Sequence, residues 1–305
     1  MKKRLAPLIC FLAALFLASC DVDTSSISNT DSSTDTTTSA PAPTTSDPTT
    51  SEPSTSSPST SEPSTSEPST SEPASSDSSD DTPIVPSAYY SKVDFSQTGN
   101  TLRGNLATLL NNAANSVPNY SKLNTTLLKS DLNPKDPKHL VGFYDRAPLN
   151  PVWDSGATWN KEHVWPNSRG VGKSGPGADP HMLRPTSVKV NSGRGNNFYG
   201  IPSKDGANTY DPGSEGYPEY RGMAARIIFY TATRYWKLNG LELSDNPSDS
   251  SSKKTMGKLS RLLEWNATYP VDPTETYRNE FLYKQYNVRN PFIDYPSLAS
   301  KIWSA

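Results

Sequence analysis

The chain has 305 residues, 29 basic and 31 acidic, and a formal net charge of −2. Its two cysteines, Cys10 and Cys20, both lie in the first 20 residues, so the rest of the chain can form neither a disulfide nor a thiolate metal site. Any metal bound there must have oxygen or imidazole ligands.

Residues 1–20 have the pattern of a lipoprotein signal peptide. Three bases precede an apolar stretch over residues 5–17 that is too short to span a bilayer. The stretch ends in Leu-Ala-Ser-Cys, which resembles the bacterial lipobox and implies lipid attachment at Cys20. We therefore expect an exported, membrane-anchored protein at the cell surface or in the periplasm, or one released from there. An ordinary secretory signal is the alternative.

Residues 21–85 are low-complexity Ser, Thr, Pro and acid, and Ser-Glu-Pro-Ser-Thr recurs at 51–55, 61–65 and 66–70. This composition predicts a disordered, extended linker. Residues 21–81 hold 12 acids and no bases, and residues 1–20 hold three bases and no acids. Residues 82–305 therefore keep 26 bases and 19 acids, a net charge of +7. A basic domain suits a polyanionic partner.

Residues 86–305 mix apolar, aromatic and charged residues as one globular domain does. Apolar spacing and turn residues predict helices at 101–117, 186–194, 220–238, 256–265 and 274–286. Strands are expected at 141–144 and within 154–165, with loops and short extended pieces over 121–151 and an extended end at 290–294. The predicted fold class is α+β, mostly helical around a few short strands.

One stretch carries the residues that phosphodiester hydrolysis needs, namely a base for water and a cation for developing charge. His163 can be the base, because the pKa of histidine lies nearest neutral pH. Glu162 beside it and Asn191 downstream offer oxygen ligands, which suit Mg²⁺ or Ca²⁺ better than zinc. Ser187, Asn191 and Arg194 would share one helix face.

Two observations oppose this interpretation. Adjacent residues of a regular strand point to opposite faces, so Glu162 and His163 can flank one phosphate only if the strand ends or bulges there. A lone histidine in an aromatic-rich strand can also be structural. A zinc site formed by His139, His163 and His181 is a further alternative, although the His-Glu-x-x-His motif of zinc proteases is absent.

The ordered motifs at 162–168, 179–185 and 190–196, continued at 220–226, 256–265 and 289–294, resemble those of the bacterial endonuclease I family, in the His-Me finger (ββα-metal) group. The resemblance implies a small ββα core in a domain spanning 86–305. It departs from the usual pattern at Met182 and Met223.

The same resemblance implies the site residues. His163 would be the general base, and Glu162 and Asn191 the ligands of one divalent ion, usually Mg²⁺, with Ca²⁺ or Mn²⁺ as substitutes. Asn196 and Asn197 compete with Asn191 for the second position. An arginine would hold the phosphate, with Arg169, Arg184 and Arg194 as open choices. His181 would orient the site rather than bind the metal.

The expected function is largely sequence-nonspecific endonucleolytic cleavage of DNA, or of RNA as well, which leaves 5′-phosphate and 3′-hydroxyl ends. Contacts would go to the nucleic-acid backbone and depend strongly on salt. The partners would be nucleic acid and, through Cys20, a membrane, with the protein itself a monomer. The alternative is a non-catalytic nucleic-acid-binding or adhesive lipoprotein on a nuclease scaffold.

Overall fold

The computed structural model describes residues 87–113, 118–248 and 254–304. The chain divides into two units at Ser75–Ser76, and the described residues belong to the second unit. The expected signal peptide, Cys20 and the linker up to residue 85 lie outside the described residues. None of the helices over the described ranges has the length and apolar character needed to cross a membrane.

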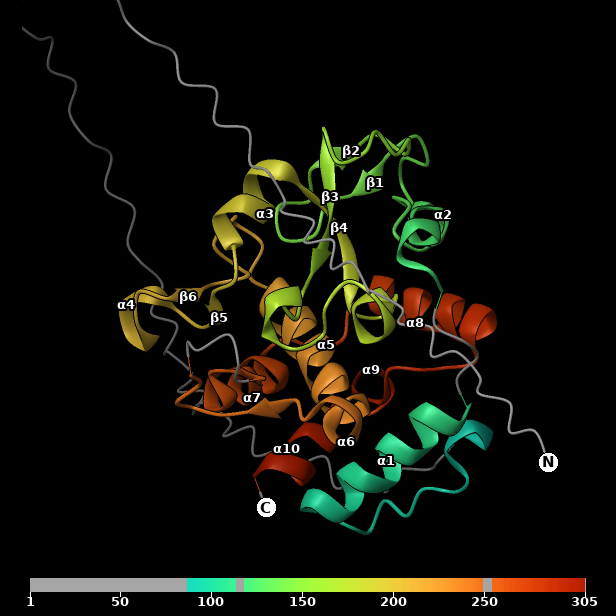
Figure 1. Cartoon of the computed structure of the whole chain (residues 1–305), viewed down its shortest axis with the longest axis vertical. Coiled ribbons are helices and arrows are strands. Elements are labelled where there is room, and N and C mark those ends of the chain that lie inside the picture. The colour runs from blue at the N-terminus through green and yellow to red at the C-terminus, as the bar shows by residue number, and fades with distance from the viewer. Residues whose placement is uncertain (1–86, 114–117, 249–253, 305) are drawn as a thin grey trace, which may run out of the picture. The chain divides into compact units, whose positions relative to one another are not determined.

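The described residues form a mostly helical α+β fold, which confirms the predicted class (Figure 1). The helices are α1 (Gly99–Ala113), α2 (Leu123–Ser130), α3 (Val188–Arg194), α4 (Pro202–Asp205), α5 (Tyr220–Arg234), α6 (Trp236–Asn239), α7 (Leu259–Thr268), α8 (Pro273–Tyr286), α9 (Pro291–Asp294) and α10 (Leu298–Trp303).

The strands pair in twos. Two pairs are antiparallel, β1 (Leu140–Val141) with β2 (Pro148–Leu149) and β3 (Trp159–His163) with β4 (Leu183–Ser187). Two are parallel, β5 (Phe198–Tyr199) with β6 (Thr209–Tyr210) and β7 (Glu242–Leu243) with β8 (Thr255–Met256).

The β3–β4 hairpin and α3 form the ββα unit that the family resemblance implied. The ladder pairs Trp159 with Ser187 at one end and His163 with Leu183 at the other. Ser187 ends β4 and caps α3, because its hydroxyl accepts a hydrogen bond from the backbone N–H of Val190 at 3.4 Å. Gly195 ends the helix with a φ of 54°, a conformation that glycine adopts without strain.

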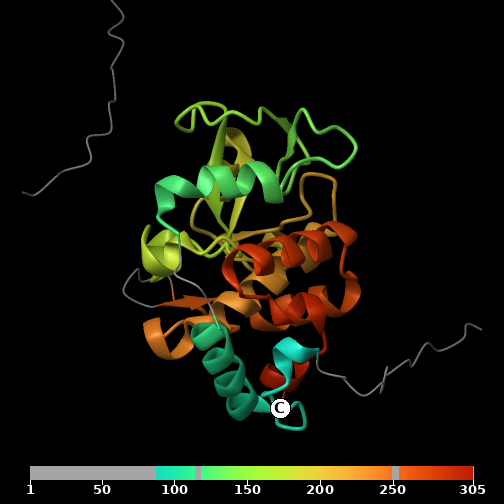
Figure 2. The ribbon, with the colours of Figure 1, turned by 90° about the vertical axis from the view of Figure 1, so that its right-hand side faces the viewer.

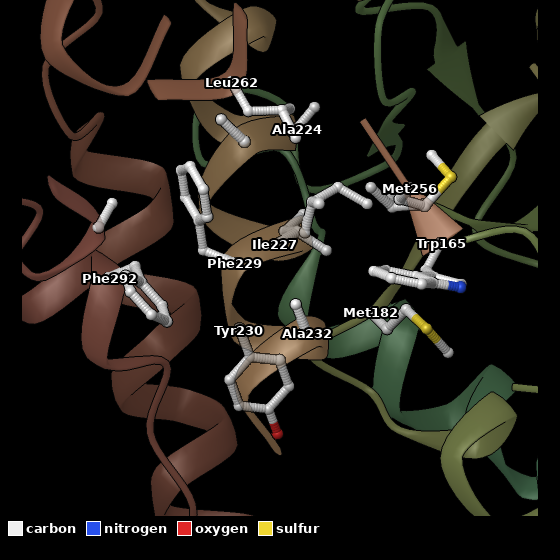
Figure 3. Packing of buried hydrophobic residues seen from close by; sticks show 14 of the residues in the cluster. Trp165, Met182, Ala224, Ile227, Phe229, Tyr230, Ala232, Met256, Leu262 and Phe292 are labelled. Atoms are coloured by element: carbon white, nitrogen blue, oxygen red, sulfur yellow. The ribbon is translucent and has the colours of Figure 1, made fainter. Parts of the chain in front are cut away.

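Helix α5 forms the centre of the main core. Every residue of it except Arg221 is buried, so it lacks the polar stripe of a surface helix. Figure 3 shows Phe229 and Phe292 on one side of α5 and Trp165 on the other. The predicted helix over 220–238 is present as α5 and the short α6, which join at Tyr235.

A second, smaller core lies between α2 and the hairpin. Leu123 and Leu127 of α2 pack with Trp159 of β3 and Leu183 of β4, and all four side chains are buried. In Figures 1 and 2 α2 lies beside one face of the hairpin, and Figure 1 shows α3 on the other side. The hairpin is thus held between two helices.

Three sequence expectations need correction. Residues 123–130 form a helix, although we expected loops and short extended pieces over 121–151. Residues 291–294 are a helical turn rather than an extended end, because the Asn290 side chain caps it through the N–H of Phe292 and Pro291 occupies its first position. The strand expected at 141–144 is reduced to β1.

Candidate functional site

Strand β3 alternates as a regular strand should, and its two faces contact different elements. Asn160 and Glu162 contact α3, where they bond to Asn191 and Arg194. Lys161 and His163, on the other face of β3, instead contact Tyr120, which begins the short 3₁₀ turn before α2. The two faces are nevertheless joined at a cavity.

A cavity of about 450 Å³ is lined by residues from both faces of β3 and by none from β4. Its lining residues are Tyr120, Trp153, Ser155, Gly156, Asn160, Lys161, Glu162, His163, Pro166, Asn167, Asn191, Gly195 and Asn196. Because β4 occupies the other edge of β3, the cavity must lie along the edge of β3 that has no strand partner within the described residues. Glu162 and His163 are the last two residues of β3, and their side chains lie on opposite faces of it. Both side chains therefore reach the same cavity without a bulge in the strand.

The Glu162 carboxylate is 3 % exposed and engages the protein through one oxygen. The Tyr144 hydroxyl donates to Oε1 at 2.9 Å, and Arg194 Nε lies 3.1 Å from the same atom. Burial raises the pKa of Glu162 to about 6, against the opposing effects of Arg194 and Tyr144. The group is therefore mostly ionised at neutral pH.

The His163 imidazole is held on two sides. Nε2 lies 2.8 Å from the carbonyl oxygen of Gly177, which can only accept, so Nε2 carries the hydrogen and the lone pair of the neutral ring is on Nδ1. The ring of Tyr120 stacks on it, with centroids 5.5 Å apart and planes 10° apart. Burial lowers the pKa of His163 to about 4. A neutral imidazole with a free Nδ1 can accept a proton at neutral pH.

The Asn191 amide is oriented by a second amide. Its Nδ2 donates to Asn160 Oδ1 at 2.8 Å, and Asn160 Nδ2 in turn donates to the carbonyl of Gly156 at 3.2 Å. These two hydrogen bonds fix which atom of the Asn191 amide is the oxygen. Of the two competing positions, Asn196 lines the cavity and Asn197 does not.

The donor set fits a hard divalent cation. Glu162 Oε2 and Asn191 Oδ1 have no hydrogen-bond partner within the described residues, and both side chains line the cavity. No group of three or more His, Cys, Asp or Glu residues that could hold a metal occurs in the described parts of the chain. A site with one carboxylate, one amide and the phosphate of a substrate suits Mg²⁺, which keeps several of its waters.

The three-histidine zinc site is not formed. His139 pairs with Asp136 through Nδ1 at 2.6 Å, and His181 Nε2 bonds to the carbonyl of Val288 at 3.0 Å. Neither histidine lines the cavity that contains His163.

None of the three arginines considered for the phosphate lines the cavity. Arg194 lies behind Glu162 and also donates to the carbonyl of Val164 at 2.7 Å. Arg169 packs over the ring of Phe198 at 3.9 Å and donates to the carbonyl of Asn196. The guanidinium of Arg184 pairs with Asp131 at 2.7 Å and lines a separate pocket of about 420 Å³.

His181 lies in the protein interior. It is 2 % exposed, packs against Tyr230 with ring centroids 4.9 Å apart, and makes no hydrogen bond to Glu162, His163 or Asn191. Burial lowers its pKa to about 4. His181 does not line the cavity that contains Glu162 and Asn191, and it precedes β4, whose Leu183 pairs with His163.

Sequence reasoning did not single out several residues of the site. Asn160 and Lys161 directly precede Glu162, and strand alternation alone would have assigned them to the two faces of β3. Tyr120, Tyr144 and Trp153 come from loops or turns before β3, and no spacing in the sequence indicates that they reach it. Met182 and Met223, where the chain departs from the family pattern, are buried in the main core, and neither lines the cavity.

Comparison with known proteins connects this geometry to a family. A family model described as Endonuclease I matches residues 98–297, a range that contains every residue lining the cavity. The chain is 37% identical over 236 residues to the extracellular ribonuclease of Bacillus amyloliquefaciens, a match that covers 73% of this chain and 80% of that protein. It is also 37% identical over 238 residues to the extracellular ribonuclease of Bacillus subtilis (strain 168), with coverage of 72% and 82%.

Proposed function

This chain belongs to the endonuclease I family and is a nuclease, and we propose that it is a divalent-metal-dependent endonuclease that hydrolyses RNA and DNA outside the cytoplasm. The observation that carries the proposal is the convergence of His163, Glu162 and Asn191 on one cavity at the unpaired edge of β3. The two relatives named extracellular ribonuclease support RNA as a substrate and export as the destination.

His163 is the general base of the proposed reaction. The Gly177 carbonyl holds the hydrogen on Nε2, so Nδ1 takes the proton from the attacking water. The lowered pKa keeps the ring neutral and ready at neutral pH. Stacking on Tyr120 restricts the ring to one plane, which preserves the direction of the Nδ1 lone pair.

Glu162 and Asn191 are the proposed ligands of the metal ion, Mg²⁺ in the first instance and Ca²⁺ or Mn²⁺ as substitutes. When bound, the ion supplies positive charge against the negative charge that develops on the phosphate and the leaving oxygen. The chain's own contribution is to keep Glu162 ionised through Arg194 and Tyr144 and to keep the Asn191 oxygen directed by Asn160.

Attack by water makes the reaction independent of the ribose 2′-hydroxyl, so the same site should cut RNA and DNA. The products would carry 5′-phosphate and 3′-hydroxyl ends. Cyclising ribonuclease chemistry would instead leave 2′,3′-cyclic phosphates and would not act on DNA. The ends of the product therefore identify the reaction.

The test uses purified protein with RNA and DNA oligonucleotides of one sequence, and mass spectrometry of the product ends. We expect both to be cleaved in Mg²⁺, with 5′-phosphate ends, and neither in EDTA. His163→Ala should lose most of the activity, while His139→Ala, on a histidine outside the cavity, should keep it. Cyclic phosphate ends, cleavage in EDTA, or binding without cleavage would overturn the proposal, the last in favour of a non-catalytic binding protein.

Anchoring through Cys20 is a separate part of the proposal and rests on the lipobox alone. Cells that express the chain should incorporate labelled palmitate into it, and Cys20→Ala should abolish the label and release the protein into the medium. Release of the unaltered protein without label would indicate that residues 1–20 are an ordinary secretory signal. Gel filtration of the purified protein tests the expected monomer.

A further inference from the structure

Lys161 is a cation of the cavity that the proposed chemistry does not use. It is 8 % exposed, it lines the cavity with Glu162 and His163, and no carboxylate pairs with it in the described residues. The arginines considered for this role do not line the cavity. A buried ammonium without a carboxylate requires other compensation, because burying a charge is costly.

That compensation comes from two aromatic rings and two acceptors. Lys161 Nζ lies 4.1 Å from the ring centroid of Tyr120 and 4.6 Å from that of Trp153, and both rings also line the cavity. Nζ donates to the carbonyl of Tyr120 at 3.2 Å and to Asn124 Oδ1 at 2.8 Å. An ammonium has three hydrogens, so one remains for a ligand.

Lys161 lies a fixed distance along β3 from His163, the proposed base. It is two residues from His163 on the same face of β3, which corresponds to roughly 6.6 Å along a strand. Both residues contact Tyr120, so the ring of Tyr120 connects the two positions. A ligand with negative charges repeated along an extended chain would place one charge at His163 and the next near Lys161.

We propose that Lys161, Tyr120 and Trp153 form a subsite for the nucleotide that adjoins the scissile phosphate. The ammonium of Lys161 contacts the phosphate of that nucleotide, and Trp153 offers a ring face on which its base stacks, while the ring of Tyr120 stays between His163 and Lys161. Every base has such a face, so the subsite selects a single-stranded segment without selecting its sequence. The position of this subsite relative to the cleaved bond rests on the proposed function, which defines the phosphate that is cut.

The partly open setting of the aromatic rings supports stacking. Tyr120 and Trp153 are each half-buried, whereas Trp159, which packs edge-on against Trp153 at 4.7 Å, is fully buried. Trp159 thus supports Trp153 from behind and leaves it accessible to the cavity. A double helix would keep its bases stacked on one another, so the subsite favours unpaired strands.

The test measures binding of a fluorescent single-stranded oligonucleotide in EDTA, where no metal-dependent cleavage occurs, over a range of salt concentrations. Lys161→Met should weaken binding roughly tenfold and reduce the slope of log K against log salt by about 0.7, the value for one phosphate contact on a single strand. Lys161→Arg should restore the slope. Lys204→Met, on an exposed lysine of α4 outside the cavity, should leave it unchanged.

Aromatic variants separate stacking from charge. Trp153→Ala should weaken binding of all base sequences alike without changing the salt slope, and Trp153→Phe should recover most of the loss. The cost of Lys161→Met in kcat/KM should also be smaller on a dinucleotide, which has a single phosphodiester, than on an oligonucleotide. Thermal unfolding of each variant checks that it is folded.

The outcomes distinguish the two proposals. A wild-type salt slope in folded Lys161→Met, or no binding by the unaltered protein, overturns the subsite. Binding with the predicted slopes but no cleavage in Mg²⁺ overturns the proposed function and leaves the subsite as a single-strand binding site.

Discussion

Glu162 divides its two carboxylate oxygens between the protein and the cavity. Oε1 receives the Tyr144 hydroxyl and the Arg194 guanidinium, while Oε2 has no partner within the described residues. The pair with Arg194 is buried, and removing one partner of such a pair costs about 3–5 kcal/mol because the other charge is left uncompensated. Arg194 thus contributes to the site by keeping Glu162 charged rather than by touching phosphate.

The first prediction concerns the acid limb of the pH–rate profile. Glu162, with a pKa of about 6, protonates before His163, with a pKa of about 4, and a protonated Glu162 cannot bind a cation. Mg²⁺ and a proton therefore compete for Glu162. Each tenfold increase in Mg²⁺ should lower the apparent pKa of the acid limb of kcat/KM by up to about one pH unit. The shift should stop where protonation of His163 begins to limit the rate. Rates measured from pH 4 to 8 at constant ionic strength check this, and a limb that ignores Mg²⁺ would contradict it.

A second prediction concerns Asn160, which holds the Asn191 amide in one orientation. Asn160→Ala should raise the Mg²⁺ concentration for half-maximal activity roughly tenfold or more, as expected when a residue that orients a metal ligand is removed. The rate at saturating Mg²⁺ should change much less. Asn160→Asp keeps the acceptor oxygen and should retain most of the affinity. A loss confined to the saturated rate would assign Asn160 another role.

At this scale the sequence supplied Glu162, His163 and Asn191, and the structure brings all three to one cavity. The sequence could not identify the residue that contacts phosphate, because the direction of an arginine side chain depends on partners far along the chain. Arg184 illustrates this, since its guanidinium pairs with Asp131, more than 50 residues earlier. The alternation that separates Glu162 from His163 holds, and the cavity at the strand edge makes it compatible with one site.

The 3₁₀ turn over Gly175–Ala178 positions the base at the scale of elements. It lies in the glycine-rich loop after β3, and its Gly177 carbonyl holds His163 Nε2 at 2.8 Å. A Cβ at Gly177 would lie 1.9 Å from the carbonyl oxygen of Gly172, so the loop can close here only with glycine. The tautomer of His163 therefore depends on close packing within a surface loop.

The third prediction follows from that packing. Gly177→Ala should force the loop away from His163 and lower kcat by roughly tenfold or more, since misplacing a base by about 1 Å can cost up to 100-fold. The matched control is Gly193→Ala in α3, where a Cβ meets nothing within 4 Å and alanine is the better helix former. Its activity should equal that of the unaltered protein. Equal activity of both variants would show that the turn does not hold the base.

The helix over 220–238 could be predicted because Ala224, Ile228 and Tyr235 recur at core spacing, whereas the buried residues of α8 are mostly polar. Helix α2 was missed because Thr125 and Thr126 have low helix propensity and its eight residues are too few to be stable alone. It forms because Leu123 and Leu127, four residues apart, bury against the hairpin. The turn at 291–294 was missed because an Asn-Pro pair can begin a helix as well as end one.

At the scale of the whole molecule, the two buried histidines connect stability to pH. Burial lowers the folded-state pKa of His163 and His181 to about 4, whereas an unfolded histidine has a pKa of about 6.5. Between these values the unfolded chain binds protons that the folded chain does not. Stability is therefore fully present above about pH 6.5 and falls as the pH drops towards 4.

The fourth prediction gives this effect a size. Each histidine should remove about 3 kcal/mol from the free energy of unfolding between pH 6.5 and 4. Glu162 opposes them, because its raised pKa of about 6 means that the folded chain binds a proton first between about pH 4.5 and 6. Urea unfolding at several pH values should show a net loss in acid. His181→Gln should reduce the slope, and an unchanged slope would mean that His181 is protonated in the folded state.

The unpaired edge of β3 has a consequence for self-association. An exposed strand edge offers free N–H and C=O groups to a strand of another copy, and proteins counter this with charged side chains on the edge strand. Along β3 the four consecutive residues from Asn160 to His163 are polar and surround the cavity on both faces. The residues that would hold a nucleic-acid strand thus also keep a second polypeptide strand away. Replacing several of these residues together by large apolar ones should cause aggregation, whereas the single substitutions Glu162→Gln and His163→Asn should remain monodisperse.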